Sequence, residues 1–486
     1  MQNSKLLNLV KSFSPEEWKA FGLFLQSPYH NTSQQALLLY RYLENCYPKF
    51  PSEQVNRKQI YSIIYPNEEK YIDRRLRDLF SGMTQLIHSF LTLEQLQKEA
   101  TLSERLAIEA LNNHKQYREA NKKSDALVNS LEEASQSTLS DYAHLQWLHH
   151  QRYFHAETTQ QAHLANHLRK AYESADDFYY LSKLRCVSEF LARAFQIQED
   201  QPFDQKQIQK LLDDSQPFES KNLLLKCYRH LVLVFREKGR YSWPLYQELK
   251  HIFFKNWQGL PDVEVQIFYK HMYNYLVNMT RQNEELYEPE KLILYRFAIG
   301  HNLLVYDNTL SLVTFTNIAF LGSKVGAFEW TENFITSHQK YLHHENRNEV
   351  VALSWAALAF YKKEWRKARD QIIQLYFRNV NFELFRRSLL LRTHFEIYVN
   401  FGEGDESFST HVDTFQHFLN RKETVQRSKA KPYLNLIRFT KRLARLKYDP
   451  NQRSLKRLKQ DIKNCEQLIF KPWITSHFKA ITPEAG

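Results

Sequence analysis

Glycine is scarce in this sequence: it supplies 10 of 486 residues, about 2% against a typical ~7%. Doubly wound nucleotide-binding folds and all-β folds use glycine in phosphate loops and tight turns. Helices joined by short turns need much less of it. The shortage therefore predicts an all-α protein.

Cysteines and long apolar runs are also few. Cys46, Cys186, Cys227 and Cys465 lie far apart and form no CxxC pair, which does not favour a disulfide framework and fits a reduced compartment. The longest apolar run, residues 352–361, contains a serine and is half of the ~20 residues that a membrane span needs. The N-terminal MQNSKLLNLVKS lacks the apolar stretch of a secretory signal. We therefore expect a cytoplasmic protein with no membrane span.

Motifs that bind nucleotides or activate nucleophiles are absent. The sequence contains no GxSxG, no P-loop and no GxGxxG. Carboxylate pairs such as Asp176-Asp177 fall at predicted helix starts or turns, where the helix dipole favours acids. We therefore expect no catalytic residue and no cofactor, and we predict a protein that is not an enzyme.

Two consecutive helical hairpins, residues 315–338 and 352–375, form the clearest pattern in the chain. In each one, a helix with a small-residue face ends in a short turn, and an aromatic residue opens a second helix. These aromatic residues, Phe328 and Trp365, are 37 residues apart, a period in the range of helical solenoids. We expect Trp365 to pack between the two helices of its hairpin. Trp18, Trp330 and Trp355 are likewise predicted to be core residues.

The two hairpins resemble tetratricopeptide repeats, whose pattern is W-x2-L-G-x2-Y…A-x3-F…P. The residues at the W, L, G, small and second aromatic positions are Phe315, Ile318, Ala319, Thr331 and Ile335 in one hairpin, and Ala352, Trp355, Ala356, Ala368 and Ile372 in the other. Gly322 and Ala359 replace the first-helix tyrosine, no proline closes either repeat, and the period is 37 rather than 34. The resemblance is strong over about 60 residues and weak over about 300. It implies a degenerate, tetratricopeptide-like α-solenoid.

The N-terminal region is predicted to be a separate helical unit. Ser14-Pro15-Glu16-Glu17 has the form of a capping box with proline at the first helical position. The helix that it starts carries Trp18, Phe21 and Leu25 on one face. FLQSPYHN (residues 24–31) and YPNEEKYIDRRLRDL (residues 65–79) resemble the start of a family of large, helical, uncharacterised bacterial proteins. That resemblance implies a helical fold and no known activity.

The chain is predicted to comprise three regions. Residues 1–95 form the N-terminal helical domain, residues 96–420 the tetratricopeptide-like solenoid, and residues 421–486 the basic C-terminal helices that cap it. Within the solenoid we predict helices at residues 160–174, 178–196 and 289–300. Turns or boundaries are expected at residues 199–202, at Gly239 and before Pro289.

The net charge of +12 is concentrated in residues 421–463, which hold 15 Lys and Arg against three acids, so the rest of the chain is formally neutral. Two amphipathic helices are predicted there, at residues 432–447 and after an Asp449-Pro450 cap. Tyr433 is expected to be buried, which leaves Phe439 and Tyr448 as the accessible aromatic residues. The candidate polyanion-binding residues are Arg438, Lys441, Arg442, Arg445, Lys456, Lys459 and Lys463.

This basic surface has several interpretations. It fits the solvated face of helices that cap a repeat array. A nucleic acid, an acidic protein or an anionic membrane surface are the open alternatives. The few aromatic residues nearby argue against single-stranded nucleic acid, whose binding proteins interleave stacking rings with charge.

A group of histidines precedes residue 168. His163 and His167 are spaced i, i+4, as in half a zinc site, but no catalytic glutamate lies between them. Further ligands would be needed, with Glu157 and Glu173 as the nearest carboxylates. We expect no metal and interpret the histidines as polar surface residues: His144, His149, His150, His155, His163 and His167.

The sequence thus predicts an interaction scaffold that holds a peptide or partner protein in a solenoid groove. This expectation rests on analogy between folds. The alternative is a nucleic-acid-associated protein that uses the basic C-terminal helices. The sequence leaves the partner and the oligomeric state open.

Overall fold

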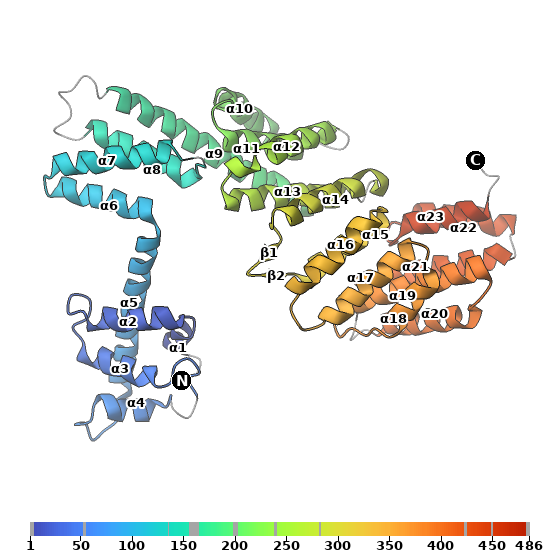
Figure 1. Cartoon of the computed structure of the whole chain (residues 1–486), viewed down its shortest axis with the longest axis horizontal. Coiled ribbons are helices and arrows are strands. Elements are labelled where there is room, and N and C mark those ends of the chain that lie inside the picture. The colour runs from blue at the N-terminus through green and yellow to red at the C-terminus, as the bar shows by residue number, and fades with distance from the viewer. Residues whose placement is uncertain are drawn as a thin grey trace. The chain divides into compact units, whose positions relative to one another are not determined.

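The computed structural model describes residues 4–51, 55–134, 136–154, 165–197, 203–237, 241–280, 283–421, 425–448 and 451–482. About 80% of the chain is helical. The described residues form 23 α-helices and two short strands (Figure 1). The prediction of an all-α protein is confirmed. None of the described helices combines the length and apolar content that a bilayer crossing requires.

The chain divides into two compact units. One contains residues 1–186, 205–229 and 259–261, and the other contains residues 187–204, 230–258 and 262–486. Helices α9 (Ala165–Ile197) and α11 (Leu223–Arg236) each contain residues of both units. The predicted boundaries after residues 95 and 420 stay predictions.

The first five helices share one aromatic-rich core. The capping box is confirmed: Ser14 Oγ accepts from the Glu17 N–H at 3.1 Å, and the Glu17 carboxylate accepts from the Ser14 N–H at 2.8 Å. The stripe of Trp18, Phe21 and Leu25 is buried, and Trp18 stacks on Tyr40 with ring centroids 4.7 Å apart. These helices are α1 (Lys5–Val10), α2 (Pro15–Gln26), α3 (Gln34–Glu44), α4 (Arg57–Ile64) and α5 (Asp73–Lys98).

The next helices include one that corrects a prediction. The two helices expected at residues 160–174 and 178–196 are, where described, the single helix α9. Asp177, which suggested a helix start, lies inside α9 and accepts a hydrogen bond from Asn222 Nδ2 at 3.2 Å. This tertiary contact satisfies a carboxylate that would otherwise favour a cap. The bounds are α6 (Ala100–Asn113), α7 (Tyr117–Glu132), α8 (Leu139–Phe154) and α9 (Ala165–Ile197).

Helix α14 also begins earlier than predicted. Its N-cap is Asn283, whose side chain accepts from the Leu286 N–H at 3.2 Å, so Pro289 lies inside the helix instead of opening it. The expected turns at residues 199–202 and Gly239 lie outside the described residues. The bounds here are α10 (Gln205–Ser215), α11 (Leu223–Arg236), α12 (Ser242–Asn256), α13 (Asp262–Thr280) and α14 (Glu284–Gly300).

A small β-hairpin that the sequence analysis missed connects α14 to α15. Strand β1 (Val305–Tyr306) pairs antiparallel with β2 (Thr309–Leu310). The two turn residues, Asp307 and Asn308, have φ of 47° and 57°. Positive φ at both central residues matches a type I′ turn, and Asp and Asn tolerate that conformation better than most residues.

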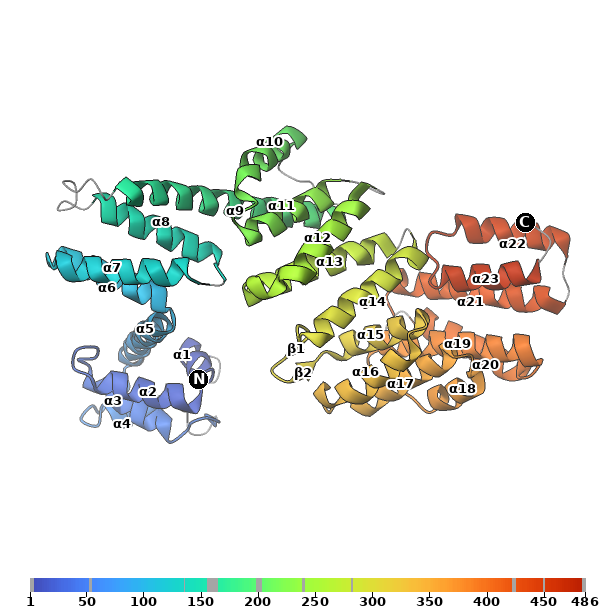
Figure 2. The same ribbon diagram turned by 45° about the horizontal axis from the view of Figure 1, so that its top comes forward.

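The two predicted hairpins form as expected. Helix α16 begins at Phe328 and α18 begins at Trp365, the two aromatic residues 37 positions apart. The helices of each hairpin pack on one another, and α15 also packs on α17 (Figure 2). Their bounds are α15 (Leu312–Lys324), α16 (Phe328–His338), α17 (Arg347–Tyr361) and α18 (Trp365–Ile373).

The tryptophans of this region are less buried than predicted. Trp365 is half-buried: it packs against the core that α17 and α18 share, and its ring also meets Phe401 of α19 (Val380–Phe401) at 6.0 Å between centroids. Trp330 and Trp355 are half-buried as well. Trp18 is a core residue, as expected.

The last five helices share the core that begins with α19. Helix α21 starts at Arg427, before the predicted Pro432, and the N-cap of α22 is Asn451, whose side chain accepts from the Ser454 N–H at 3.2 Å. Asp449 and Pro450, the predicted cap, lie outside the described residues. The bounds are α19 (Val380–Phe401), α20 (Asp405–Asn420), α21 (Arg427–Tyr448), α22 (Gln452–Asn464) and α23 (Lys471–Ile481).

A close approach of α15 and α16 generates a prediction. A Cβ atom on Gly322 would collide with Thr331 Oγ1, which is buried and held by a 2.8 Å hydrogen bond to the Ala327 carbonyl. The equivalent pair in the second hairpin is Ala359 and Ala368, both buried. Gly322→Ala should therefore destabilise α15–α16 by about 1–2 kcal/mol, because overpacking outweighs the gain in helix propensity.

The same substitution in a Thr331→Ala background should be neutral or stabilising by up to ~1 kcal/mol, because it recreates the Ala·Ala pair of the second hairpin. Hydrogen–deuterium exchange of the α15 and α16 amides in the four proteins of this cycle measures both effects. Additive effects of the two substitutions would contradict the close contact.

Candidate functional site

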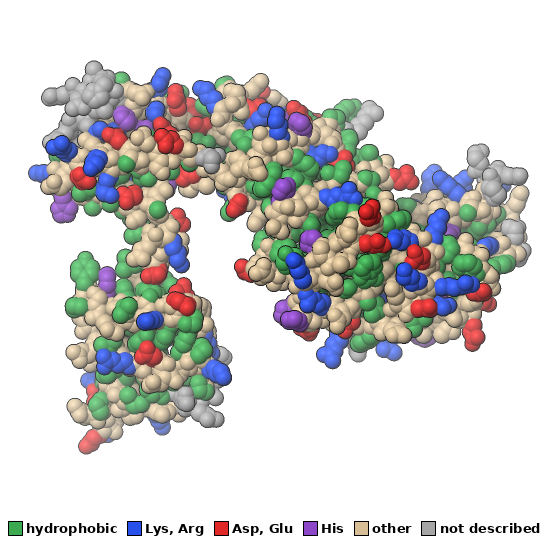
Figure 3. Space-filling model, in the orientation of Figure 1, with side chains coloured by type: hydrophobic (Ala, Val, Ile, Leu, Met, Phe, Trp, Pro, Cys, Tyr) green, Lys and Arg blue, Asp and Glu red, His purple; other side chains and the backbone are tan. Residues whose placement is uncertain are grey.

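The predicted basic surface lies on α21 and α22. Of its α21 members, Arg438 and Arg445 are exposed, whereas Lys441 and Arg442 are half-buried. All three of its α22 members are exposed: Lys456, Lys459 and Lys463. Figure 3 shows that, on the face in view, blue and red side chains alternate over the C-terminal half of the chain.

An acidic residue divides this surface. Asp461 of α22 accepts a hydrogen bond from Arg442 Nη1 of α21 at 2.5 Å. That hydrogen bond, with the charges of Arg442, Arg457 and Arg438, holds the pKa of Asp461 below its usual value. Arg438 and Arg442 thus already have a carboxylate close by, which the sequence analysis did not anticipate.

The α22 lysines face another way. At 3.6 residues per turn, Lys456, Lys459 and Lys463 lie roughly 140–160° round the helix from Asp461. They share one exposed face and are directed away from the arginines that surround Asp461. The helical spacing therefore separates the seven candidate residues into two groups.

The aromatic residues of this region differ from the prediction. Phe439, expected to be accessible, is fully buried, and the Arg438 guanidinium lies 4.6 Å from its ring centroid. Tyr433 is half-buried. Among the described residues of α21 and α22, Tyr448 alone offers an exposed ring. A base-stacking platform of several rings is therefore absent from this part of the structure.

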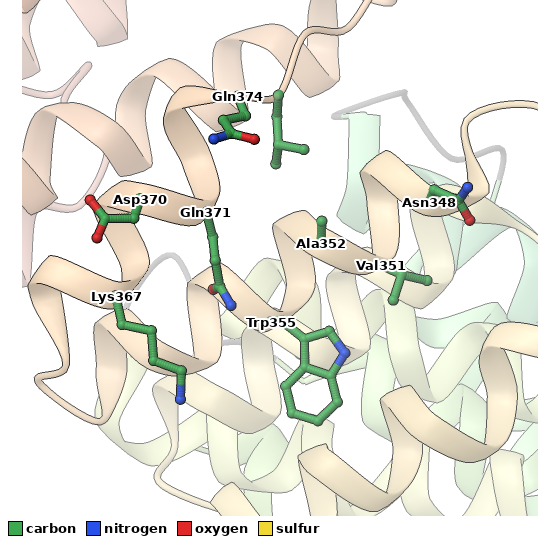
Figure 4. Close-up of a pocket in the computed structure, with 9 residues that line it drawn as sticks. Asn348, Val351, Ala352, Trp355, Lys367, Asp370, Gln371 and Gln374 are labelled. Atoms are coloured by element: carbon green, nitrogen blue, oxygen red, sulfur yellow. The ribbon is translucent and has the colours of Figure 1, made fainter.

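A second candidate site lies between the two helices of the second hairpin. The pocket has a volume of about 810 Å³. The lining residues of each helix are spaced i, i+3, i+4 and i+7, which places them on one helical face. The pocket therefore lies between one face of α17 and one face of α18 (Figure 4). The lining residues are Asn348, Val351, Ala352 and Trp355 of α17, Lys367, Asp370 and Gln371 of α18, and Gln374 and Leu375, which follow α18.

One polar atom of this pocket lacks a hydrogen-bond partner. The Gln371 amide extends from α18 toward the Trp355 ring on α17 (Figure 4). Its Oε1 atom is buried and has no hydrogen-bond partner within the described part of the chain. A buried acceptor without a partner is costly, so a donor supplied by a ligand would be stabilised there.

One histidine of α8, His149, is buried and pairs with the half-buried His167 of α9, whereas His144 is half-buried and His150 is exposed. His149 is 1% exposed, and its Nδ1 lies 3.0 Å from Nδ1 of His167, while its Nε2 lies 3.4 Å from Glu132. Desolvation, aided by the neighbouring His167, lowers the pKa of His149. Glu132 is also paired with Lys170 at 2.6 Å. The surface interpretation is thus wrong for His149.

The i, i+4 pair His163 and His167, for which we expected no metal, lies partly outside the described residues. His155, Glu157 and His163 are not described. Glu173, the other possible ligand, lies 4.0 Å from Arg169 on its own helix. In the described ranges, no group of three or more His, Cys, Asp or Glu side chains is arranged to hold a metal ion.

Comparisons with protein families, with curated protein sequences and with solved structures yield no match for this chain. The site is therefore interpreted from its own geometry.

A second buried histidine pair, on α19 and α20, predicts a pH dependence. Burial lowers the pKa of His394 to about 4 and that of His411 to about 3. Both are below the unfolded value of about 6.5, so the folded state binds fewer protons, and the stabilisation present above pH 6.5 is lost as the pH falls. Between pH 7 and 5 each histidine should cost about 2 kcal/mol.

Hydrogen–deuterium exchange of the α19 and α20 amides at the two pH values measures this loss. His411 Nε2 lies 2.9 Å from the Arg387 carbonyl, and a glutamine at this position can donate the same hydrogen bond without titrating. His411→Gln should therefore remove about half of the pH dependence. His417→Gln, an exposed position on the same helix, is the matched control and should leave it unchanged. An unaltered pH dependence in His411→Gln would refute the assignment.

Proposed function

We propose that this chain is a non-enzymatic interaction scaffold of the tetratricopeptide-like α-solenoid type, which binds a peptide or a partner protein. The observation that carries the proposal is the repetition of α15–α16 in α17–α18. The two hairpins share the aromatic residue that opens the second helix, a small-residue contact between the helices and the 37-residue spacing. Stacked hairpins of this kind create extended binding surfaces.

The order of contacts among the C-terminal helices gives further support. Helix α17 contacts α15, α16, α18 and α19, and α19 in turn contacts α20 and α21. Contacts that pass from each helix to its next neighbours are typical of repeat arrays. The pocket between α17 and α18, at about 810 Å³, lies within the ~300–1,000 Å³ range of ligand sites.

The N-terminal motifs favour a bacterial origin for this architecture. The segments at residues 24–31 and 65–79 include the end of α2 and the beginning of α5, helices of the N-terminal core. We propose that the chain belongs with the large helical bacterial proteins that those segments resemble. The family relationship adds no reaction to the proposal.

A second candidate function is binding of nucleic acid by the basic helices. The observation that favours it is the exposed lysine face of α22, directed away from Asp461. Backbone phosphates are recognised by such surfaces through charge. The buried Phe439 and the Arg442–Asp461 ion pair argue for the scaffold as the first choice.

A pull-down with the tagged full chain from its host tests the scaffold. One protein should remain bound after a wash at about 500 mM salt, because groove contacts are short-range and little screened. Loss of every protein in that wash, with only nucleic acid retained at low salt, would reject the scaffold in favour of the second candidate.

Polyanion binding is tested by salt titration with single-stranded and double-stranded oligonucleotides. If six cations contact phosphates, affinity should fall about 10³-fold between 50 and 200 mM salt. Replacing Lys456, Lys459 and Lys463 by Glu should reduce the slope of log affinity against log salt by about 2.7. These positions are preferable to Arg442, whose reversal would also break its ion pair with Asp461.

The matched control reverses three exposed helical lysines elsewhere, Lys19, Lys206 and Lys210. This control variant changes the net charge by the same amount as the α22 variant, and it should leave the slope of log affinity against log salt unaltered. Equal losses in both variants would show that only total charge matters, and no binding at about 50 mM salt would eliminate the nucleic-acid candidate.

A further inference from the structure

The internal repeat explains why a pocket exists in the second hairpin. In the first hairpin, Phe315 of α15 and Phe334 of α16 are both buried, with ring centroids 5.1 Å apart. A shift of 37 residues places Ala352 and Gln371 at the equivalent positions, and both line the pocket between α17 and α18. The two rings that close the first hairpin are therefore missing from the second.

A third ring is missing as well. Trp330 stacks on Phe334 in the first hairpin at 5.6 Å between centroids, and its equivalent in the second hairpin is Lys367. The pocket thus lies where the first hairpin holds an aromatic cluster. The pocket is open to solvent, so a ring that enters from outside would regain the apolar contacts that the missing rings make in the first hairpin.

The walls that remain suit a ring with a hydrogen-bond donor next to it. Val351, Leu375 and the half-buried Trp355 supply apolar surface. Gln371 Oε1 is the buried acceptor that lacks a partner among the described residues. A backbone N–H beside an aromatic side chain provides both groups at once.

The charges on the walls select an uncharged occupant. Lys367 is paired with Glu364 at 2.8 Å, and Asp370 is paired with Arg369 at 2.8 Å. Each charged residue that lines the pocket is therefore paired with an oppositely charged residue close to it in the sequence. A charged ligand group would therefore meet no unpaired counter-charge on these walls.

We propose that the pocket between α17 and α18 binds an aromatic side chain from an uncharged peptide segment of a partner protein. On binding, the Gln371 side chain rotates so that its Oε1, which is buried in the free chain, accepts a hydrogen bond from the backbone N–H of that segment. This inference rests on the proposed scaffold function and assigns its contact site.

The test uses the full chain labelled with 5-fluorotryptophan, with the Trp355 resonance identified through Trp355→Phe. The probe is N-acetyl-phenylalanine amide, and the matched probe without a ring is N-acetyl-alanine amide. The phenylalanine probe should shift the Trp355 fluorine resonance with a dissociation constant of about 1 mM, as expected for a ligand of this size. The alanine probe should produce no saturable shift.

Two variants make the test specific. Ala352→Phe with Gln371→Phe rebuilds the ring pair of the first hairpin and should abolish binding. Gln371→Met keeps the side-chain volume but removes the acceptor, and should weaken binding about fivefold. The control is Gln416→Met, at an exposed position on α20, which should bind as the wild type does. Gln371→Met keeps the test decisive if the double variant does not fold.

Several outcomes would overturn the inference: no shift up to about 20 mM probe, equal shifts with both probes, or unchanged affinity in the folded double variant. Unchanged affinity in Gln371→Met would overturn the assigned hydrogen bond. A partner retained equally by wild type and the folded double variant in the pull-down would reject the pocket and leave the scaffold standing. Probe binding by a chain that retains no partner would reject the scaffold alone.

Discussion

The contact of small residues between paired helices is the constraint on which the C-terminal architecture depends. Interaxial distance is set by the side chains at the crossing. Gly322 faces Thr331 in one hairpin, and Ala359 and Ala368 hold the same positions in the next. Because α17 packs on both α15 and α18, its position is fixed from two sides. The buried apolar faces of all four helices then form one cluster.

Away from this close contact, the space between the two helices of a hairpin can hold different side chains. Phe315 and Phe334 close the first hairpin with two rings, while Ala352 and Gln371 leave the second open. The small-residue contact preserves the spacing of the helices, so the loss of the rings produces a pocket where the helices would otherwise collapse together. A repeat can thus diverge at its lining residues while its framework is kept.

Features governed by local signals could be predicted from the sequence. The capping box at Ser14 and the starts of α16 and α18 depend on a few adjacent residues. Features that depend on distant residues could not. Helix α9 continues through Asp177, whose carboxylate has a distant partner in Asn222. The Asp307-Asn308 turn has positive φ at both residues, which the sequence analysis did not consider. The basic residues were found by counting charges, but the Asp461 ion pair required the packing of α22 on α21.

The two candidate surfaces use different physics, and this difference constrains what each can recognise. The lysine face of α22 would act through charge that salt screens over about 10 Å, so it would distinguish partners mainly by charge density. The α17–α18 pocket has its charges balanced locally and would act through shape and one unsatisfied acceptor. Such contacts would favour a ligand that carries a donor, since only that ligand pairs an acceptor that is unpaired in the free chain. A partner selected for its sequence is therefore better matched to the pocket than to the basic helices.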